Sequence, residues 1–244
     1  MDVILQDRIP YDTGPKRLPS IAPLDPADWL IRDEAFAAQM ALRDHLITTR
    51  RQEVIAVTDD GRAAADEVFE TVLARLADDP AYRVTEDQAT RPDDVTVPLN
   101  RDDPLGTLGR LVQQDFCLME KAPGADEHVL TAAVLCFPAG WMLAQKIGRP
   151  LLRIHVPVPA YDADIAKRVQ RLFDGVQVGR PLWRYNALGY VDPALFQPRA
   201  EGVPKYGETA EQRFIRSERQ TILRLPKTGA VVFGIHTFMV RNSL

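Results

Sequence analysis

Polar side chains occupy both faces of one segment that otherwise has the pattern of a β-strand. Because side chains alternate along a strand, the segment 214–225 places two polar sets on opposite faces, Arg216, Glu218 and Gln220 on one and Ser217, Arg219 and Thr221 on the other. Such a strand is either a solvated edge strand, where charged residues are common, or a strand whose polar face lines a pocket. The pattern by itself favours neither interpretation.

His155 is the histidine with the most constrained surroundings. It lies between Ile154 and Val156, and Pro157 and Pro159 stiffen the backbone that follows. A structural histidine is the common interpretation of an imidazole among apolar residues. A stiff backbone also holds an imidazole in the fixed orientation that an iron ligand needs, so His155 is a candidate ligand.

The other histidines and the cysteines give no further catalytic signature. His236, in the middle of an expected strand, is a second candidate ligand, whereas His45 and His128 are expected to be structural or exposed. No two histidines have the spacing of a zinc site. Cys117 and Cys136 lie in apolar surroundings without a C-x-x-C motif, so we expect two buried free thiols in a reducing compartment.

Composition is that of a globular protein and excludes several classes of function. The chain has 244 residues, of which 45% are hydrophobic and 26% are charged, and its formal net charge is −4. No basic block indicates nucleic-acid binding. The N-terminus has early acids and no apolar signal region, and the apolar run 129–137 is too short to cross a bilayer. We expect a soluble, cytoplasmic protein with no membrane or nucleic-acid partner.

Helical periodicity and strand-like runs together indicate an α+β protein. Helices are expected at 26–51, from Gly61 to Pro80, at 141–147, and from Asp162 or Asp164 to Phe173. Strands are expected at 127–137, at 183–189, and at 214–225 and 229–240 as an antiparallel hairpin, while 108–120 is either a strand or a helix-to-strand junction. Helices followed by mostly antiparallel strands are not typical of a dinucleotide-binding fold, and neither a G-x-G-x-x-G nor a P-loop motif is present.

Several of these segments together resemble a known protein family. They are LDPADWL (24–30), LVQQDFCLM (111–119), LCFPAGWMLAQKIGRPLLRIHVPVPAY (135–161), PLWRYNAL (181–188), LF (195–196) and FIRSERQTILRLPKTGAVVFGIHTF (214–238). In this order they resemble the family of the alpha subunit of haem-dependent oxidative N-demethylase, the dimethylamine monooxygenase. The similarity covers nearly the whole chain.

The resemblance implies a PAS-like α+β domain, a mostly antiparallel sheet with flanking helices, that holds a b-type haem. Residues 25–244 would form this single haem-binding domain, after an extended N-terminal arm at 1–24. His155 is then the expected axial ligand of the iron, and Trp141 is expected to wall the haem slot. The expected partners of the haem propionates are cations close in sequence, namely Lys146, Arg149 and Arg153.

The family's reaction also requires a site for an amine, which is a cation at neutral pH. The resemblance implies that O₂ and electrons remove a methyl group from a small secondary amine and release formaldehyde. Glu218 is the expected carboxylate that binds the ammonium group or accepts its proton, and Arg219, Arg216 or Gln220 would hold Glu218 or contact a propionate. Since the sequence has no nucleotide fingerprint and no cysteine cluster, we expect a partner reductase with flavin and iron–sulfur centres to supply the electrons.

Two alternatives remain open at this point. A PAS-like fold also suits a haem- or ligand-binding sensor without catalysis, or a haem-less partner subunit. If the enzyme interpretation holds, His155 and Glu218 should face one cavity from opposite sides. Members of the family generally continue past the strand that ends near Val240 into further helices, so we expect a protein that either lacks this cap or extends beyond Leu244.

Overall fold

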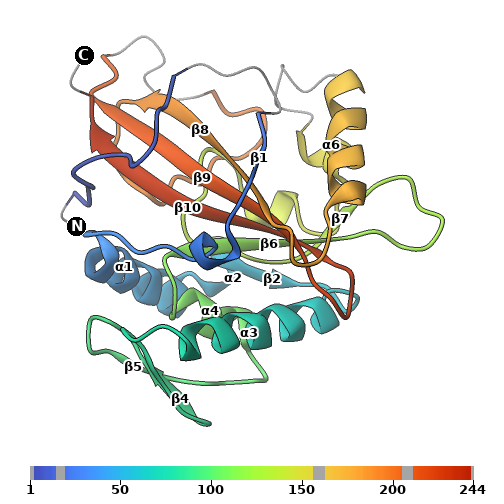
Figure 1. The fold of residues 1–244 in the computed structure, drawn as a ribbon. Helices are drawn as coiled ribbons and strands as arrows, with labels where there is room; N and C mark the ends of the chain where they lie inside the picture. Colours follow the sequence, from blue (N-terminus) through green and yellow to red (C-terminus); the bar gives the residue numbers. More distant parts are fainter. Residues whose placement is uncertain (1–2, 15–19, 156–162, 205–210, 243–244) are drawn as a thin grey trace.

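The computed structural model describes residues 3–14, 20–155, 163–204 and 211–242. In these residues a seven-stranded sheet, a three-stranded sheet and six α-helices form a mixed α+β fold (Figure 1). All strand pairs are antiparallel. The expected α+β class with a mostly antiparallel sheet is therefore confirmed.

The large sheet has the strand order β1-β8-β9-β10-β6-β7-β2. Its strands, in this spatial order, are Ala22–Pro23, Leu182–Tyr190, Phe214–Arg224, Val231–Arg241, Gln114–Glu120, Val129–Val134 and Ile55–Val57. The small sheet contains β3 (Arg83–Val84), β4 (Gln88–Thr90) and β5 (Thr96–Pro98). The hairpin of β9 and β10 forms as expected and lies near the middle of the large sheet.

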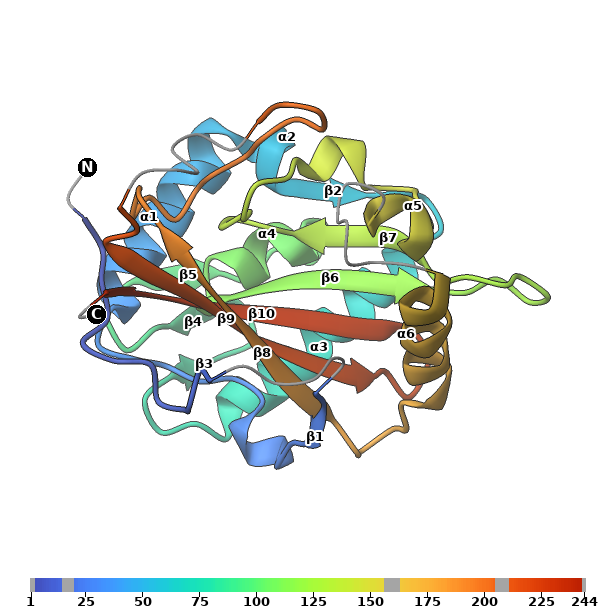
Figure 2. The same cartoon turned by 90° about the horizontal axis from the view of Figure 1, so that it is seen from above.

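Helices cover both faces of the large sheet. They are α1 (Phe36–Thr49), α2 (Arg51–Val54), α3 (Arg62–Ala77), α4 (Pro104–Gly109), α5 (Leu151–His155) and α6 (Ala163–Gly175), with 3₁₀ turns at Pro26–Asp28 and Leu143–Gln145. The helices α1, α3 and α4 lie on one side of the sheet and α6 on the other, where Figure 2 shows α5 and α6 side by side. Among the described residues, no helix is long and apolar enough to span a membrane.

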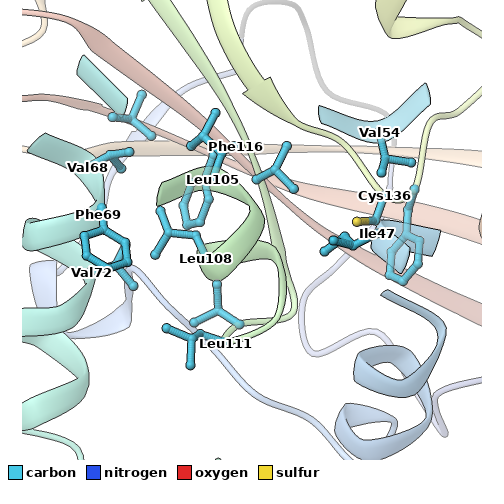
Figure 3. Close-up of a cluster of buried hydrophobic side chains, with 14 of the residues drawn as sticks. Ile47, Val54, Val68, Phe69, Val72, Leu105, Leu108, Leu111, Phe116 and Cys136 are labelled. Atoms are coloured by element: carbon cyan, nitrogen blue, oxygen red, sulfur yellow. The ribbon is translucent and has the colours of Figure 1, made fainter. Parts of the chain in front are cut away.

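The main hydrophobic core fills the space between the sheet and α1, α3 and α4. On α3, Val68, Val72 and Leu76 recur every four residues and are at most 2% exposed, which is why this helix was predictable from its periodicity. Figure 3 shows part of the core, with labelled side chains Ile47, Val54, Val68, Phe69, Val72, Leu105, Leu108, Leu111, Phe116 and Cys136. Both Cys117 and Cys136 are buried free thiols, as expected.

The expected long helix at 26–51 is wrong, because the chain leaves helical geometry between Trp29 and Ala35. Asp25 accepts a hydrogen bond from the Ala27 N–H and begins a single 3₁₀ turn, and α1 starts only at Phe36. Asp33 interrupts the helix, since its carboxylate accepts bonds from the Ala35 N–H and from Gln113 of the distant β6 region. The contact between Asp33 and Gln113 could not be predicted from the sequence, because the two residues are far apart in the chain.

Two expectations around His155 also changed. The helix expected at 141–147 is only the 3₁₀ turn Leu143–Gln145, while an unexpected α-helix, α5, ends at His155. The backbone that Pro157 and Pro159 are expected to stiffen belongs to residues 156–162, which lie outside the described residues. The junction at 108–120 resolves into the end of α4 followed by β6.

Buried charges fix the segment that leaves β7. The Asp115 carboxylate accepts the N–H groups of Cys136 and Phe137 at 2.8 and 2.9 Å, and pairs with Arg43 Nη1 at 2.7 Å. The Phe137 carbonyl in turn accepts a bond from Arg216 Nη2 at 2.5 Å. The chain that leads towards α5 is therefore held at Phe137 by charges of opposite sign, one on each side of its backbone.

Substitution of Asp115 tests this anchoring. Asp115→Ala leaves Arg43 buried without a counter-charge, so we expect the free energy of unfolding to fall by about 3–5 kcal/mol. The measurement is urea unfolding followed by circular dichroism. Asp66→Ala is the control, because the Arg62–Asp66 pair is about half exposed and should contribute about 0.3–0.5 kcal/mol. A loss at Asp115 no larger than at Asp66 would contradict the role of this ion pair.

Candidate functional site

A group of polar side chains lies on one face of strands β8, β9 and β10. In the antiparallel register, Asn186 of β8 and Thr237 of β10 flank Glu218, and Arg184 of β8 is paired with Gln220. Directly paired residues point their side chains to the same face of a sheet, so these five share one face. We call it the site face.

The site face is the one that α5 and α6 cover. Ile235 pairs with Gln220 and therefore lies on the site face. Its side chain belongs to a hydrophobic cluster that also contains Leu151 of α5 and Phe173 of α6. The polar group thus continues directly into an apolar region beneath these two helices.

The edge-strand interpretation of 214–225 is wrong, because β9 lies between β8 and β10. Its polar side chains are buried, and the Glu218 residue is only 8% exposed. Glu218 Oε2 accepts hydrogen bonds from Asn186 Nδ2 at 2.9 Å and Gln220 Nε2 at 3.0 Å, and Oε1 lies 3.8 Å from Arg216 Nη2. The carboxylate is therefore held in one orientation by neighbouring donors.

Several polar atoms around Glu218 lack hydrogen-bond partners. Within the described residues, the fully buried atoms without a partner on the site face include Arg184 Nε, Gln220 Oε1 and Thr237 Oγ1. A buried polar atom left unpaired costs about 1–3 kcal/mol, so a native site that retains such atoms is a place where a ligand or water can bind. The three atoms belong to residues paired with each other or with Glu218.

His155 is the last residue of α5 and is partly buried. Its Nδ1 lies 2.8 Å from the carbonyl oxygen of Leu151, one turn earlier. A carbonyl only accepts hydrogen bonds, so Nδ1 carries the proton and Nε2 carries the lone pair in the neutral ring. In metal-ligating histidines a hydrogen bond from one ring nitrogen to the backbone fixes the tautomer and the orientation of the ring in the same way.

The positive charge of Arg184 interacts electrostatically with both His155 and Glu218. Burial lowers the pKa of His155, the bond to Leu151 opposes this, and the nearby charges of Lys146 and Arg184 lower it further. Burial also lowers the pKa of Arg184, which the negative charge of Glu218 partly offsets. The structure therefore brings His155, Arg184 and Glu218 into one electrostatic environment.

The cations expected near the propionates are mostly engaged elsewhere. Lys146 Nζ donates to the Ile154 carbonyl and to Glu201 Oε1, both at 2.6 Å, and Arg153 donates to Glu201 at 3.0 and 3.2 Å. The bonds from Arg153 and Lys146 lower the pKa of Glu201 to about 2. Arg149 is exposed. Lys146 and Arg153 therefore hold the α5 segment to the loop that contains Glu201.

Arg219 does not lie with the other expected site residues. As the strand alternation requires, it points to the face opposite Glu218. There it donates to the carbonyls of Asp28 and Trp29 at 2.7 and 3.4 Å and lies 5.6 Å from the Trp183 ring centroid. The expectation that Arg219 holds Glu218 or a propionate is corrected to a structural role on the opposite face.

Two further candidates are placed by the structure. Trp141 is half-buried and packs against the hydrophobic cluster under α5 and α6. His236 is fully buried on the face opposite Glu218, with Nε2 2.9 Å from Asp33 Oδ2. His236 therefore serves as a partner of Asp33 and is removed from the group around Glu218.

Sequence reasoning missed Arg184, Asn186 and Thr237. Arg184 and Asn186 are two residues apart in an expected strand, so their common face was predictable. Their alignment with Gln220 and Glu218 depends on the register between β8 and β9, which a connection of about twenty residues does not reveal. Thr237 carries no charge, and nothing in the sequence around it indicated that it belongs to a site.

The sequence matches a known protein family over most of its length. Residues 20–243 match the family model described as "Haem-dependent oxidative N-demethylase, alpha subunit-like". The match covers the three strands that carry the polar group and the helix that carries His155.

The tautomer of His155 is directly measurable. An unperturbed histidine is about half protonated near pH 6.5, whereas we expect the partly buried His155 ring to be less protonated there, with the proton of its neutral form on Nδ1. Because the folded pKa lies below the unfolded value of 6.5, the unfolded chain takes up the proton first, and the folded state loses stability as pH falls through this value. Nitrogen-15 NMR of the haem-free protein is the measurement.

The control for this experiment is the same protein unfolded in urea, where the ring should titrate normally. His155→Ala assigns the signal. A ring that is imidazolium at pH 6.5, or that carries its proton on Nε2, would contradict the geometry described for α5.

Proposed function

The chain belongs to the haem-dependent oxidative N-demethylase alpha subunit-like family, and from this premise we propose that it binds a b-type haem and demethylates a small secondary amine oxidatively. O₂ would be the oxidant and formaldehyde the product. The observation that carries this proposal is the placement of a lone-pair-bearing imidazole, His155, on the same side of the sheet as the buried carboxylate Glu218. The two groups suit an iron and an amine respectively.

The residues present fit a haem in three respects. His155 has the tautomer of an axial ligand, fixed by its bond to Leu151. Trp141, Leu151 and Ile154 supply an apolar surface beside it. Arg184 supplies a cation without a hydrogen-bonded partner among the described residues, as the anionic edge of a porphyrin requires. When bound, the haem would supply the activation of O₂.

Glu218 would bind and orient the amine. A secondary ammonium ion has one positive charge and two N–H donors, and a buried carboxylate is a strong acceptor for both. Asn186 and Gln220 hold Oε2 of Glu218, while the unpartnered Gln220 Oε1 and Thr237 Oγ1 lie beside it as further acceptors. Glu218 would also accept the proton that the ammonium must lose before its nitrogen lone pair is available.

The proposed reaction also needs a source of electrons, a folded haem-binding domain and a compartment. Electrons would come from a partner reductase with flavin and iron–sulfur centres, because the sequence carries no motif for either group. We further propose that residues 25–244 form one haem-binding domain after an arm at 1–24, and that the protein works in the cytoplasm, where its two buried thiols stay reduced.

Removal of the Glu218 charge tests the proposal. Glu218→Gln keeps the size of the side chain but loses the charge-assisted bond to the ammonium, worth about 1.5–3 kcal/mol. We expect amine affinity to fall about tenfold to a hundredfold, while haem content is unchanged. The measurements are the amine-induced shift of the Soret band and formaldehyde release from dimethylamine with a reductase and O₂.

The control is Glu70→Gln, an exposed glutamate of α3 that pairs with Arg101 on the other side of the molecule. It should leave both measurements unchanged. Haem binding without formaldehyde release by the wild type would support a sensor instead of an enzyme. Equal amine affinity in the wild type and in Glu218→Gln would exclude Glu218 as the amine-binding group.

A further inference from the structure

The side chain of Arg184, which is partly buried, differs from those of the buried arginines in having no hydrogen-bond partner among the described residues. The arginines at 43, 91, 216 and 219 each donate at least two hydrogen bonds to carboxylates or backbone carbonyls. Within the described parts of the chain, the Arg184 side chain takes part in no hydrogen bond or ion pair, and its Nε is completely enclosed. This guanidinium is thus charged, partly desolvated and unpaired.

An unpaired arginine of this kind is unfavourable for folding alone. Arginine remains protonated in proteins, so it cannot escape the cost of burial by losing its charge. Burial lowers the pKa of Arg184, and Glu218 is the acid that opposes this shift. The Glu218 carboxylate, however, already accepts bonds from Asn186 and Gln220 and lies near Arg216. An external anion would compensate the charge of Arg184.

The position of Arg184 indicates which anion this is. Arg184 is paired with Gln220 on the site face, and its charge reaches His155. Of the cations closer to His155 in sequence, Lys146 and Arg153 are already bound to Glu201, and Arg149 is exposed. A ligand held at His155 and carrying a negative group would therefore meet Arg184 as its unsatisfied donor.

We propose that Arg184 is the anion-binding residue of this site and that it takes a carboxylate, which for a haem held by His155 is a propionate. This inference rests on the proposed haem function. The planar fork of a guanidinium matches the two oxygens of a carboxylate, which gives orientation as well as affinity. Arg184 would thereby help to hold the haem and leave Glu218 for the amine.

The test compares haemin with haemin dimethyl ester, in which both carboxylates are uncharged esters. Each is titrated into the full haem-free chain and followed by the Soret band. The variants are Arg184→Gln, Arg184→Lys and the control Arg180→Gln, which removes an exposed positive charge from the turn before β8. The control reports any effect of net charge alone.

We expect Arg184→Gln to weaken haemin binding about tenfold or more and to leave binding of the dimethyl ester unchanged. Arg184→Lys should retain part of the haemin affinity, and Arg180→Gln should match the wild type. Equal losses for haemin and its ester, or no loss for either, would overturn the role of Arg184 while leaving the proposed function intact. Failure of the wild type to bind haemin would overturn both.

Thermal unfolding separates ligand binding from a structural role. If the only role of Arg184 is to bind a ligand, it does not stabilise the haem-free protein. Without haemin, Arg184→Gln should therefore have the same melting temperature as the wild type or a higher one. With haemin it should be less stabilised than the wild type, in proportion to the weaker binding. A clear loss of melting temperature without haemin would show that Arg184 has a structural role and would overturn the proposal.

Discussion

The central position of β9 is the constraint on which the rest of the structure depends. The charged side chains of β9 are buried because both faces of the sheet are covered at this central strand, and each buried charge needs a partner in the protein or in a ligand. Arg216 and Arg219 meet this need with backbone carbonyls from segments far away in sequence. Glu218 meets it with side-chain amides. The partners of β9 therefore decide where the surrounding segments lie.

Strand alternation divides these partners into two sets with different consequences. Arg219 binds the carbonyls of Asp28 and Trp29 and so attaches the N-terminal segment to the face opposite Glu218. Arg216 binds the carbonyl of Phe137, whose N–H is bound by Asp115, and so holds the chain that leads to α5. His155 is placed relative to Glu218 through this anchored segment. One strand thus provides both the carboxylate and part of the support for the imidazole.

Local patterns were predictable and long-range partners were not. The periodicity of α3 and the β9–β10 hairpin depend on neighbouring residues, and both formed as expected. The break before α1 depends on Asp33, whose partner His236 is 203 residues away. The edge-strand interpretation of 214–225 failed for the same reason, because the pairing with β8 crosses a long connection. His155 and Glu218 were identifiable as chemical types, whereas Arg184 is notable for lacking a partner, which only a structure reveals.

The central claim is that His155 holds the iron of a haem on the face of the sheet that carries Glu218. The most direct measurement is the Soret spectrum of His155→Gly with and without added imidazole, with the exposed His45 substituted by alanine as the control. The account predicts that His155→Gly loses the wild-type band, that imidazole restores it by occupying the vacated position, and that His45→Ala keeps it. An unchanged band in His155→Gly would show that another residue binds the iron and would contradict the account.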